Sequence, residues 1–240
     1  MTHFIVRGFS IHFVLALCLT SVVLTNASTK IDNLNGIDIK LPDVRLINGV
    51  TLQRNGQGVR RISFFGMDIN IYVAGLYSQS PLLSEEDVMS RCSRISSSTT
   101  GVISAFSSSS SSSLANDNEN DPESNSNNCP LLQLDFTFLR SVNRGKVIMA
   151  WQRQLDYSVS YTYNGYENDR DDFVRMMSSG PIEYEGTQTV QLIGDETLIF
   201  DQGKYMGKIT GHEFQKSFLS MWFGENPVAH DLKEGLLSGF

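Results

Sequence analysis

Residues 59–77 read VRRISFFGMDINIYVAGLY, and this stretch predicts a β-hairpin. β-branched and aromatic side chains, which favour strands, dominate both halves of it. Gly66 lies in the middle, where a tight turn requires a residue that tolerates unusual backbone angles. Apolar strands on both sides of one turn are typical of the centre of an antiparallel sheet. We therefore expect the fold to be built around this hairpin.

Further strands are predicted after the hairpin. Residues 131–139 alternate between an apolar face, with Leu132, Leu134, Phe136 and Phe138, and a polar face, with Gln133, Asp135 and Thr137. This period of two predicts a strand with one buried face. Glycine-containing turns separate a final set of short strands, Thr187–Ile193, Thr197–Asp201 and Lys204–Ile209. These strands predict an antiparallel meander.

Apolar residues at helical spacing predict helices at Asn143–Ser158, Asn168–Ser178 and His212–Phe223, and a last helix after Pro227. The helix at 212–223 carries an aromatic stripe, which is more typical of a protein core than of a ligand pocket: Phe214, Phe218, Trp222 and Phe223. Strands with helices grouped late in the chain indicate a layered α+β fold.

The composition bounds the class of protein. The 240 residues are 40% hydrophobic and 19% charged, which is typical of a globular chain, and the length suits one domain once the biased segments are set aside. The 26 Asp and Glu residues outnumber the 19 Lys and Arg residues. Since no basic stripe is present, a nucleic acid is not expected as a partner.

Residues 1–27 are predicted to be a signal peptide that is cleaved after Ala27. They contain an early arginine, an apolar run from Phe9 to Leu24 and small residues at the end. The alternative is a retained membrane anchor, although a run of about 16 residues is shorter than the roughly 20 that span a bilayer. Cleavage predicts a location in the secretory pathway or outside the cell, with no stable membrane span afterwards.

Residues 93–128 are predicted to be a disordered insertion rich in Ser and Asn. They include seven consecutive serines, Ser107–Ser113, and almost no residue that would join a core. Cys92 and Cys129 flank the insertion. A disulfide between them would close this segment into a loop, and two unpaired thiols are the alternative.

Two groups of residues carry a resemblance to a known family. Gly58-Val59-Arg60, Phe64-Phe65-Gly66 and the run from Ile71 to Tyr77 resemble the first core hairpin of the chalcone isomerases. The run from Gly207 to Gly211, Leu219-Ser220-Met221-Trp222-Phe223-Gly224 and Pro227-Val228 resemble the chalcone isomerase-like domain. The resemblance covers residues 47–92 and 130–238.

This resemblance implies a chalcone isomerase-like domain at 47–238, interrupted by the insertion and preceded by an N-terminal extension at 28–46. It also implies the fold, an open-faced β-sandwich in which a layer of α-helices covers a large antiparallel sheet. The ligand cleft would lie between the sheet and the helices.

The resemblance places Arg60 on an arginine that binds an enolate-like oxygen in the isomerases or a carboxylate in their non-catalytic relatives. A solvated arginine at a strand end is the alternative. Tyr72 stands where the isomerases have a threonine that holds a water. Of the isomerases' tyrosine, lysine and asparagine at the following helix, only the lysine remains, because the matching residues are Asn143, Lys146 and Ala150. Efficient chalcone cyclisation is therefore not expected.

The function predicted from these residues is binding of a fatty acid or similar hydrophobic carboxylate, anchored by Arg60. Tyr72, Lys146 and Asn143 are the further ligand-binding candidates. An intramolecular lyase acting on an unknown substrate is the alternative, with Arg60 as its catalytic candidate, and a non-catalytic protein that binds a partner is the third possibility. No phosphate loop, serine elbow or metal-binding motif is present, so no cofactor or metal is expected. The sequence does not predict an oligomeric state.

Overall fold

The computed structural model describes residues 32–34, 37–39, 41–91, 131–158 and 163–239. The predicted signal peptide, the predicted insertion and the possible disulfide between Cys92 and Cys129 lie outside the described residues.

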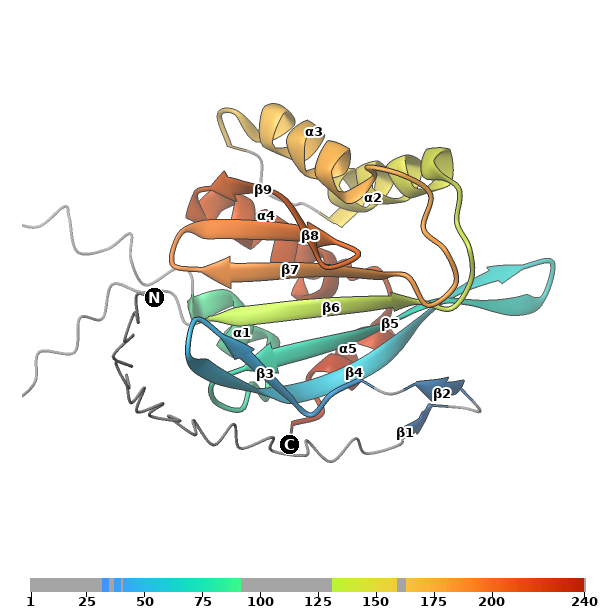
Figure 1. Ribbon diagram of the computed structural model, residues 1–240, viewed down its shortest axis with the longest axis horizontal. Coiled ribbons are helices and arrows are strands. Elements are labelled where there is room, and N and C mark those ends of the chain that lie inside the picture. Colours follow the sequence, from blue (N-terminus) through green and yellow to red (C-terminus); the bar gives the residue numbers. More distant parts are fainter. Residues whose placement is uncertain (1–31, 35–36, 40, 92–130, 159–162, 240) are drawn as a thin grey trace, which may run out of the picture.

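An antiparallel sheet of seven strands forms the centre of the molecule (Figure 1). Its strands lie side by side in chain order, and each one is antiparallel to its neighbours. They are β3 (Val44–Ile47), β4 (Val50–Phe64), β5 (Met67–Ser78), β6 (Leu132–Phe138), β7 (Thr187–Ile193), β8 (Glu196–Asp201) and β9 (Lys204–Thr210). The short strands β1 (Asp32–Leu34) and β2 (Ile37–Ile39) pair only with each other.

Helices pack on one face of this sheet. They are α2 (Arg144–Ser158), α3 (Tyr166–Met177), α4 (His212–Phe223) and α5 (His230–Leu236), and α1 (Glu85–Arg91) contacts α4. Here α3 lies over β8 and β9, and α5 lies over β4. The predicted α+β fold, a large antiparallel sheet covered by a layer of helices, is confirmed.

The main core fills the space between the sheet and the helices. The alternating apolar residues of β6 contribute to it as predicted. The aromatic stripe of α4 is also core, because its members are almost completely buried: Phe214, Phe218, Trp222 and Phe223. Burial of this apolar surface drives the helices onto the sheet.

The central hairpin is longer than the sequence pattern indicates. The predicted turn at Gly66 is present, but β4 begins at Val50, nine residues before Val59. The register between β4 and β5 shifts between Arg54 and Gly56 and again between Arg60 and Arg61. Such irregularities bend a strand and increase its twist. The far end of the hairpin extends beyond the other strands (Figure 1).

Small residues allow α5 to lie directly on β4. An added Cβ at Gly56 would lie 2.3 Å from the carbonyl oxygen of Gly235, and one at Gly58 would lie 2.8 Å from Leu232 Cδ1. No side chain fits at this spacing without movement of the neighbouring atoms. The glycines therefore set the distance between the strand and the helix.

The other face of the sheet is partly covered by the chain that precedes β4. Leu41 is buried against Val59 and Val73. Gln133 and Asp135 are each only 4% exposed, although the alternating pattern in residues 131–139 placed them on the polar face. The pattern therefore predicted the correct side for each residue but not the burial of both sides. The covering segment includes β3, whose first three residues lie in the predicted N-terminal extension.

Candidate functional site

Arg60 and Tyr72 lie opposite each other on neighbouring strands. They are cross-strand partners in the register of β4 and β5, and side chains at such paired positions lie on the same face of a sheet. Tyr72 belongs to the main core, so this face is the one that the helices cover. The hairpin therefore brings Arg60 and Tyr72 together at the boundary between the sheet and the helices.

Tyr72 contacts an aromatic cluster contributed by β6 and two helices. Its ring meets Phe136 edge to face, with centroids 5.4 Å apart. Phe136 lies 5.4 Å from Trp222 of α4 and 5.7 Å from Trp151 of α2, and the two indoles are 6.2 Å apart. Phe138 flanks Tyr72 at 5.7 Å. These rings form an apolar interior next to the Tyr72 hydroxyl.

Hydrogen-bond donors surround this interior. Among the described residues, the buried Nε1 of Trp222 has no well-formed hydrogen bond, although it approaches the Tyr72 hydroxyl closely enough to influence the pKa of that hydroxyl. Burial raises the pKa of Tyr72, and Trp222 and the positive charge of Arg60 oppose that increase. The hydroxyl is therefore protonated at neutral pH. It contributes a donor, as do the indole and the guanidinium.

Arg60 has no carboxylate partner in the part of the chain that the structure describes. Its half-buried guanidinium donates one hydrogen bond, from Nη1 to the carbonyl oxygen of Arg61 at 2.6 Å. A guanidinium has five N–H donors, so most of those on Arg60 have no acceptor among the described residues. An anion at this position could accept hydrogen bonds from the guanidinium, whose orientation is already fixed by its bond to the Arg61 carbonyl oxygen.

The other predicted ligand residues lie at the start of α2. Asn143 accepts a hydrogen bond at Oδ1 from the backbone N–H of Lys146 at 3.0 Å, so it caps the helix. Both side chains are exposed. No hydrogen bond or ion pair between described residues connects them to Arg60 or Tyr72. Their proposed contact with a ligand stays a prediction, while the structure gives Asn143 a role in stabilising the helix.

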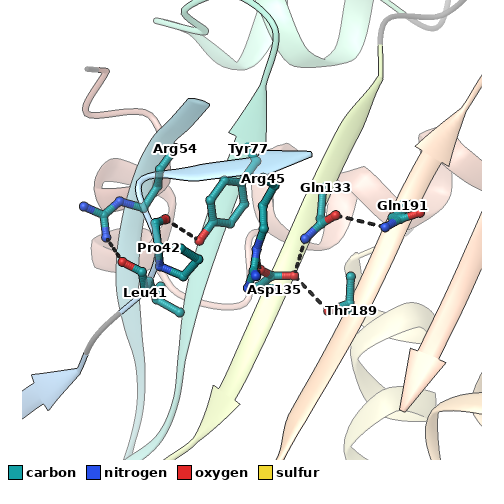
Figure 2. A network of polar contacts seen from close by, with 9 residues as sticks. All are labelled: Leu41, Pro42, Arg45, Arg54, Tyr77, Gln133, Asp135, Thr189 and Gln191. Carbon is teal, nitrogen blue, oxygen red and sulfur yellow. Dashed lines mark hydrogen bonds and ion pairs between the residues drawn. The ribbon is translucent and has the colours of Figure 1, made fainter. Parts of the chain in front are cut away.

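A second polar arrangement lies on the open face of the sheet, and the sequence did not predict it (Figure 2). Asp135 accepts hydrogen bonds from Gln133 Nε2 at 2.7 Å, from Thr189 Oγ1 at 2.8 Å and from Arg45 Nε at 2.8 Å. Gln191 Nε2 extends the network to Gln133 Oε1 at 3.0 Å. The only sequence signal was an acidic residue in the middle of a strand, and its partner Arg45 lies 90 positions away.

The same network holds the segment before β4 against the sheet. The Tyr77 hydroxyl donates to the carbonyl oxygen of Pro42 at 2.9 Å. Arg54 donates to the carbonyl oxygen of Leu41 at 3.1 Å and pairs with Asp43 at 2.7 Å. Figure 2 shows the contacts of Tyr77 with Pro42 and of Arg54 with Leu41. They serve to fix the covering segment.

A family comparison identifies the fold from sequence. Residues 114–238, slightly more than half of the chain, match the family described as chalcone isomerase-like. The chain belongs to the chalcone isomerase-like family. The match starts inside the predicted insertion and does not include the hairpin. The family match therefore does not cover Arg60 and Tyr72, and only the fold supports the resemblance in that part of the chain. A comparison with curated proteins gave no match.

The fold itself is similar to that of a solved structure, the fatty-acid binding protein AtFAP1 of Arabidopsis thaliana. The two share 15% sequence identity with a TM-score of 0.54, and the alignment covers 83% of this chain and 92% of that one. At this identity the similarity establishes the chalcone isomerase-like fold alone.

Two grooves lie on the face of the chalcone isomerase-like sheet that is opposite the helices. The larger has a volume of about 1000 Å³ and the smaller about 340 Å³, and Arg45 lines both. The larger is also lined by Leu41, Leu139, Arg140 and Tyr184. Neither is lined by the predicted ligand-binding residues.

The described residues lack two other kinds of feature. No group of three or more His, Cys, Asp or Glu side chains in these residues is arranged to hold a metal ion. No helix in the same residues has the length and apolar character needed to span a membrane.

Proposed function

We propose that this chain binds a fatty acid or a similar hydrophobic carboxylate between the sheet and the helices, with Arg60 as the anchor for the carboxylate. The observation that carries the proposal is the gathering of three hydrogen-bond donors at one point of an apolar interior. The donors are the guanidinium of Arg60, the hydroxyl of Tyr72 and the indole N–H of Trp222. The similarity of the fold to a fatty-acid binding protein supports it.

The chemistry of these donors suits a carboxylate. A guanidinium forms two parallel hydrogen bonds with a carboxylate, and these bonds are shorter and stronger than bonds between neutral groups. The protonated Tyr72 hydroxyl would donate a further bond. A buried donor without a partner costs about 1–3 kcal/mol, so a ligand that accepts from Trp222 Nε1 would recover that free energy.

The aromatic cluster would line the acyl chain. Because Tyr72, Phe136 and Trp222 contact one another, a chain that enters among them must displace at least one ring from its present position. Rotation of aromatic side chains is a modest change compared with unfolding, and the new contacts with the acyl chain would replace the lost ones. We expect binding to perturb both indoles.

Intrinsic fluorescence tests this proposal directly. The chain has two tryptophans, Trp151 and Trp222, and both belong to the cluster. Titration with a saturated fatty acid should change the emission intensity or wavelength along a saturating curve. Replacing Trp222 by Phe should remove much of that change. A flat titration, together with no bound lipid in native mass spectrometry of the purified protein, would favour a non-catalytic role in which the side chains close the interior.

A further inference from the structure

The tip of the β4–β5 hairpin is the most conspicuous apolar feature on the described surface. Phe65 is 89% exposed, Met67 63% and Ile62 41%. The tip extends past the ends of the neighbouring strands, away from α1 at the opposite end of the sheet (Figure 1). Apolar side chains at such a position do not stabilise the fold by burial.

The turn itself does not explain the aromatic residue. Phe64 pairs with Met67, so Phe65 and Gly66 form a two-residue turn, with φ angles of 51° and 75°. Turns of this type favour Asn followed by Gly, because both central residues adopt positive φ. A bulky aromatic residue is unfavourable in this conformation. Phe65 therefore stands where asparagine would give a more stable turn.

We propose that this tip inserts into the interface of a lipid bilayer. Aromatic side chains bury roughly 150–250 Å² each, so the three exposed apolar side chains of this tip together offer less than about 750 Å². A standard protein interface buries about 800 Å² on each partner, which makes a second copy of the chain or another protein a poor fit. A bilayer interface is deformable and accepts single aromatic rings, which concentrate at the level of the lipid headgroups.

The charges behind the tip agree with this partner. Arg61 lies four residues before Phe65, a distance of about 13 Å along a strand. Its Nε donates to Asn70 Oδ1 at 3.1 Å, and its nearest carboxylate, that of the exposed Asp231, is 3.8 Å away. An arginine at this distance from an inserted ring reaches the lipid phosphates. Asp68 is the acidic group at the tip, and it accepts a hydrogen bond from Ser63.

This inference goes beyond the proposed function and depends only on the hairpin. Arg60 lies on the same strand, so the inserted tip would hold Arg60 near the acyl chains of the bilayer. Membrane binding is nevertheless measured without any fatty acid, and failure of one proposal leaves the other standing.

Sedimentation with phosphatidylcholine vesicles tests the inference, using wild type and Phe65→Asn. The wild type should bind, and the variant should bind at least roughly fivefold more weakly because it loses the largest inserted side chain. The melting temperature of Phe65→Asn should be equal or higher, since Asn-Gly suits the turn. The control is Leu83→Ser, which removes another exposed apolar side chain, 70% exposed, next to α1. This control should bind like the wild type.

Several results would overturn the inference. One is no sedimentation of the wild type with vesicles. Another is equal binding by wild type and Phe65→Asn. A third is a dimer in analytical ultracentrifugation that Phe65→Asn abolishes, because the tip would then serve contact between copies of the chain.

Discussion

Arg45 and Asp135 form an ion pair that spans the open face of the sheet, from the edge strand β3 to the central strand β6. Nη2 of Arg45 lies 2.5 Å from Oδ2 of Asp135, and the guanidinium passes 5.5 Å from the centre of the Tyr77 ring on β5. Asp135 is almost completely buried, whereas the Arg45 side chain is 38% exposed. One side chain of the covering segment therefore compensates the charge of a buried carboxylate.

Removing this arginine should destabilise the fold. Breaking a fully buried ion pair costs about 3–5 kcal/mol, and the exposure of Arg45 reduces the expected loss for Arg45→Met to about 1–3 kcal/mol. Urea unfolding measures the difference. The double variant Arg45→Met with Asp135→Asn should recover part of the loss, because the amide carries no charge. A double variant less stable than Arg45→Met would contradict this role of the ion pair.

The close packing of α5 on β4 predicts unequal effects of two alanine substitutions. Gly56→Ala places a Cβ against backbone atoms of Gly235 and should cost at least about 2 kcal/mol, since overpacking of rigid neighbours is destabilising. Gly180→Ala is the control, because its Cβ would meet nothing within 4 Å. It should leave the free energy of unfolding nearly unchanged. Equal effects in thermal unfolding would show that the spacing of strand and helix is adjustable.

Buried tyrosines predict a loss of stability at alkaline pH. Burial is the main cause that raises the pKa of Tyr72, Tyr77, Tyr163 and Tyr166, the last to about 12. Above pH 10 the unfolded chain releases these protons while the folded protein retains them, so the unfolded state is increasingly favoured. The stabilisation is complete below pH 10 and is lost as the pH rises through the raised values. Urea unfolding between pH 9 and pH 11 should show the decrease.

Tyr166→Phe separates one contribution from the others. The Tyr166 hydroxyl is buried without a hydrogen-bond partner among the described residues, so its removal should be neutral or stabilising by about 1 kcal/mol at pH 8. The variant should also lose less stability at alkaline pH. The exposed Tyr184 provides the matched control, Tyr184→Phe, which should follow the wild type. A marked loss of stability at pH 8 would show that the hydroxyl has a partner in solution.

Asn143 allows its structural role to be separated from ligand binding. Asn143→Ala removes the cap of α2 and should cost about 1 kcal/mol, whereas Asn143→Asp keeps a capping oxygen and should be close to wild type in stability. Neither variant should weaken fatty-acid binding much, because the side chain is exposed at the helix start. Weaker binding by Asn143→Asp, with unchanged melting temperature, would return Asn143 to the ligand site.

The sequence patterns correctly predicted individual strands, helices and turns. The alternation in β6, the amphipathic stripes of α2 and α4 and the turn at Gly66 all reflect side-chain directions within one element. The resemblance added the layered arrangement. β3 was not predicted, because four residues are too few for an alternating pattern to be distinguished from chance.

The contacts between distant segments could not be predicted in the same way. Asp135 meets Arg45 only because the strand order places β3, β4, β5 and β6 side by side, and strand order does not follow from periodicity. Arg60 and Tyr72 are paired across the two strands next to a register shift, and such a shift does not follow from periodicity either. The candidate ligand residues came from the resemblance, and the structure supports the proximity of Arg60 and Tyr72 without testing their binding role.

The most direct test of the proposed function compares a saturated fatty acid with the alcohol of the same chain length, using isothermal titration calorimetry on wild type and Arg60→Met. The methionine keeps an apolar side chain but removes the charged donors. Loss of a buried contact between arginine and carboxylate costs about 2–5 kcal/mol, so the wild type should bind the acid at least tenfold more tightly than Arg60→Met does. The alcohol should bind both proteins with similar affinity. Equal affinity of wild type and Arg60→Met for the acid would contradict the account, because Arg60 would then not anchor the carboxylate.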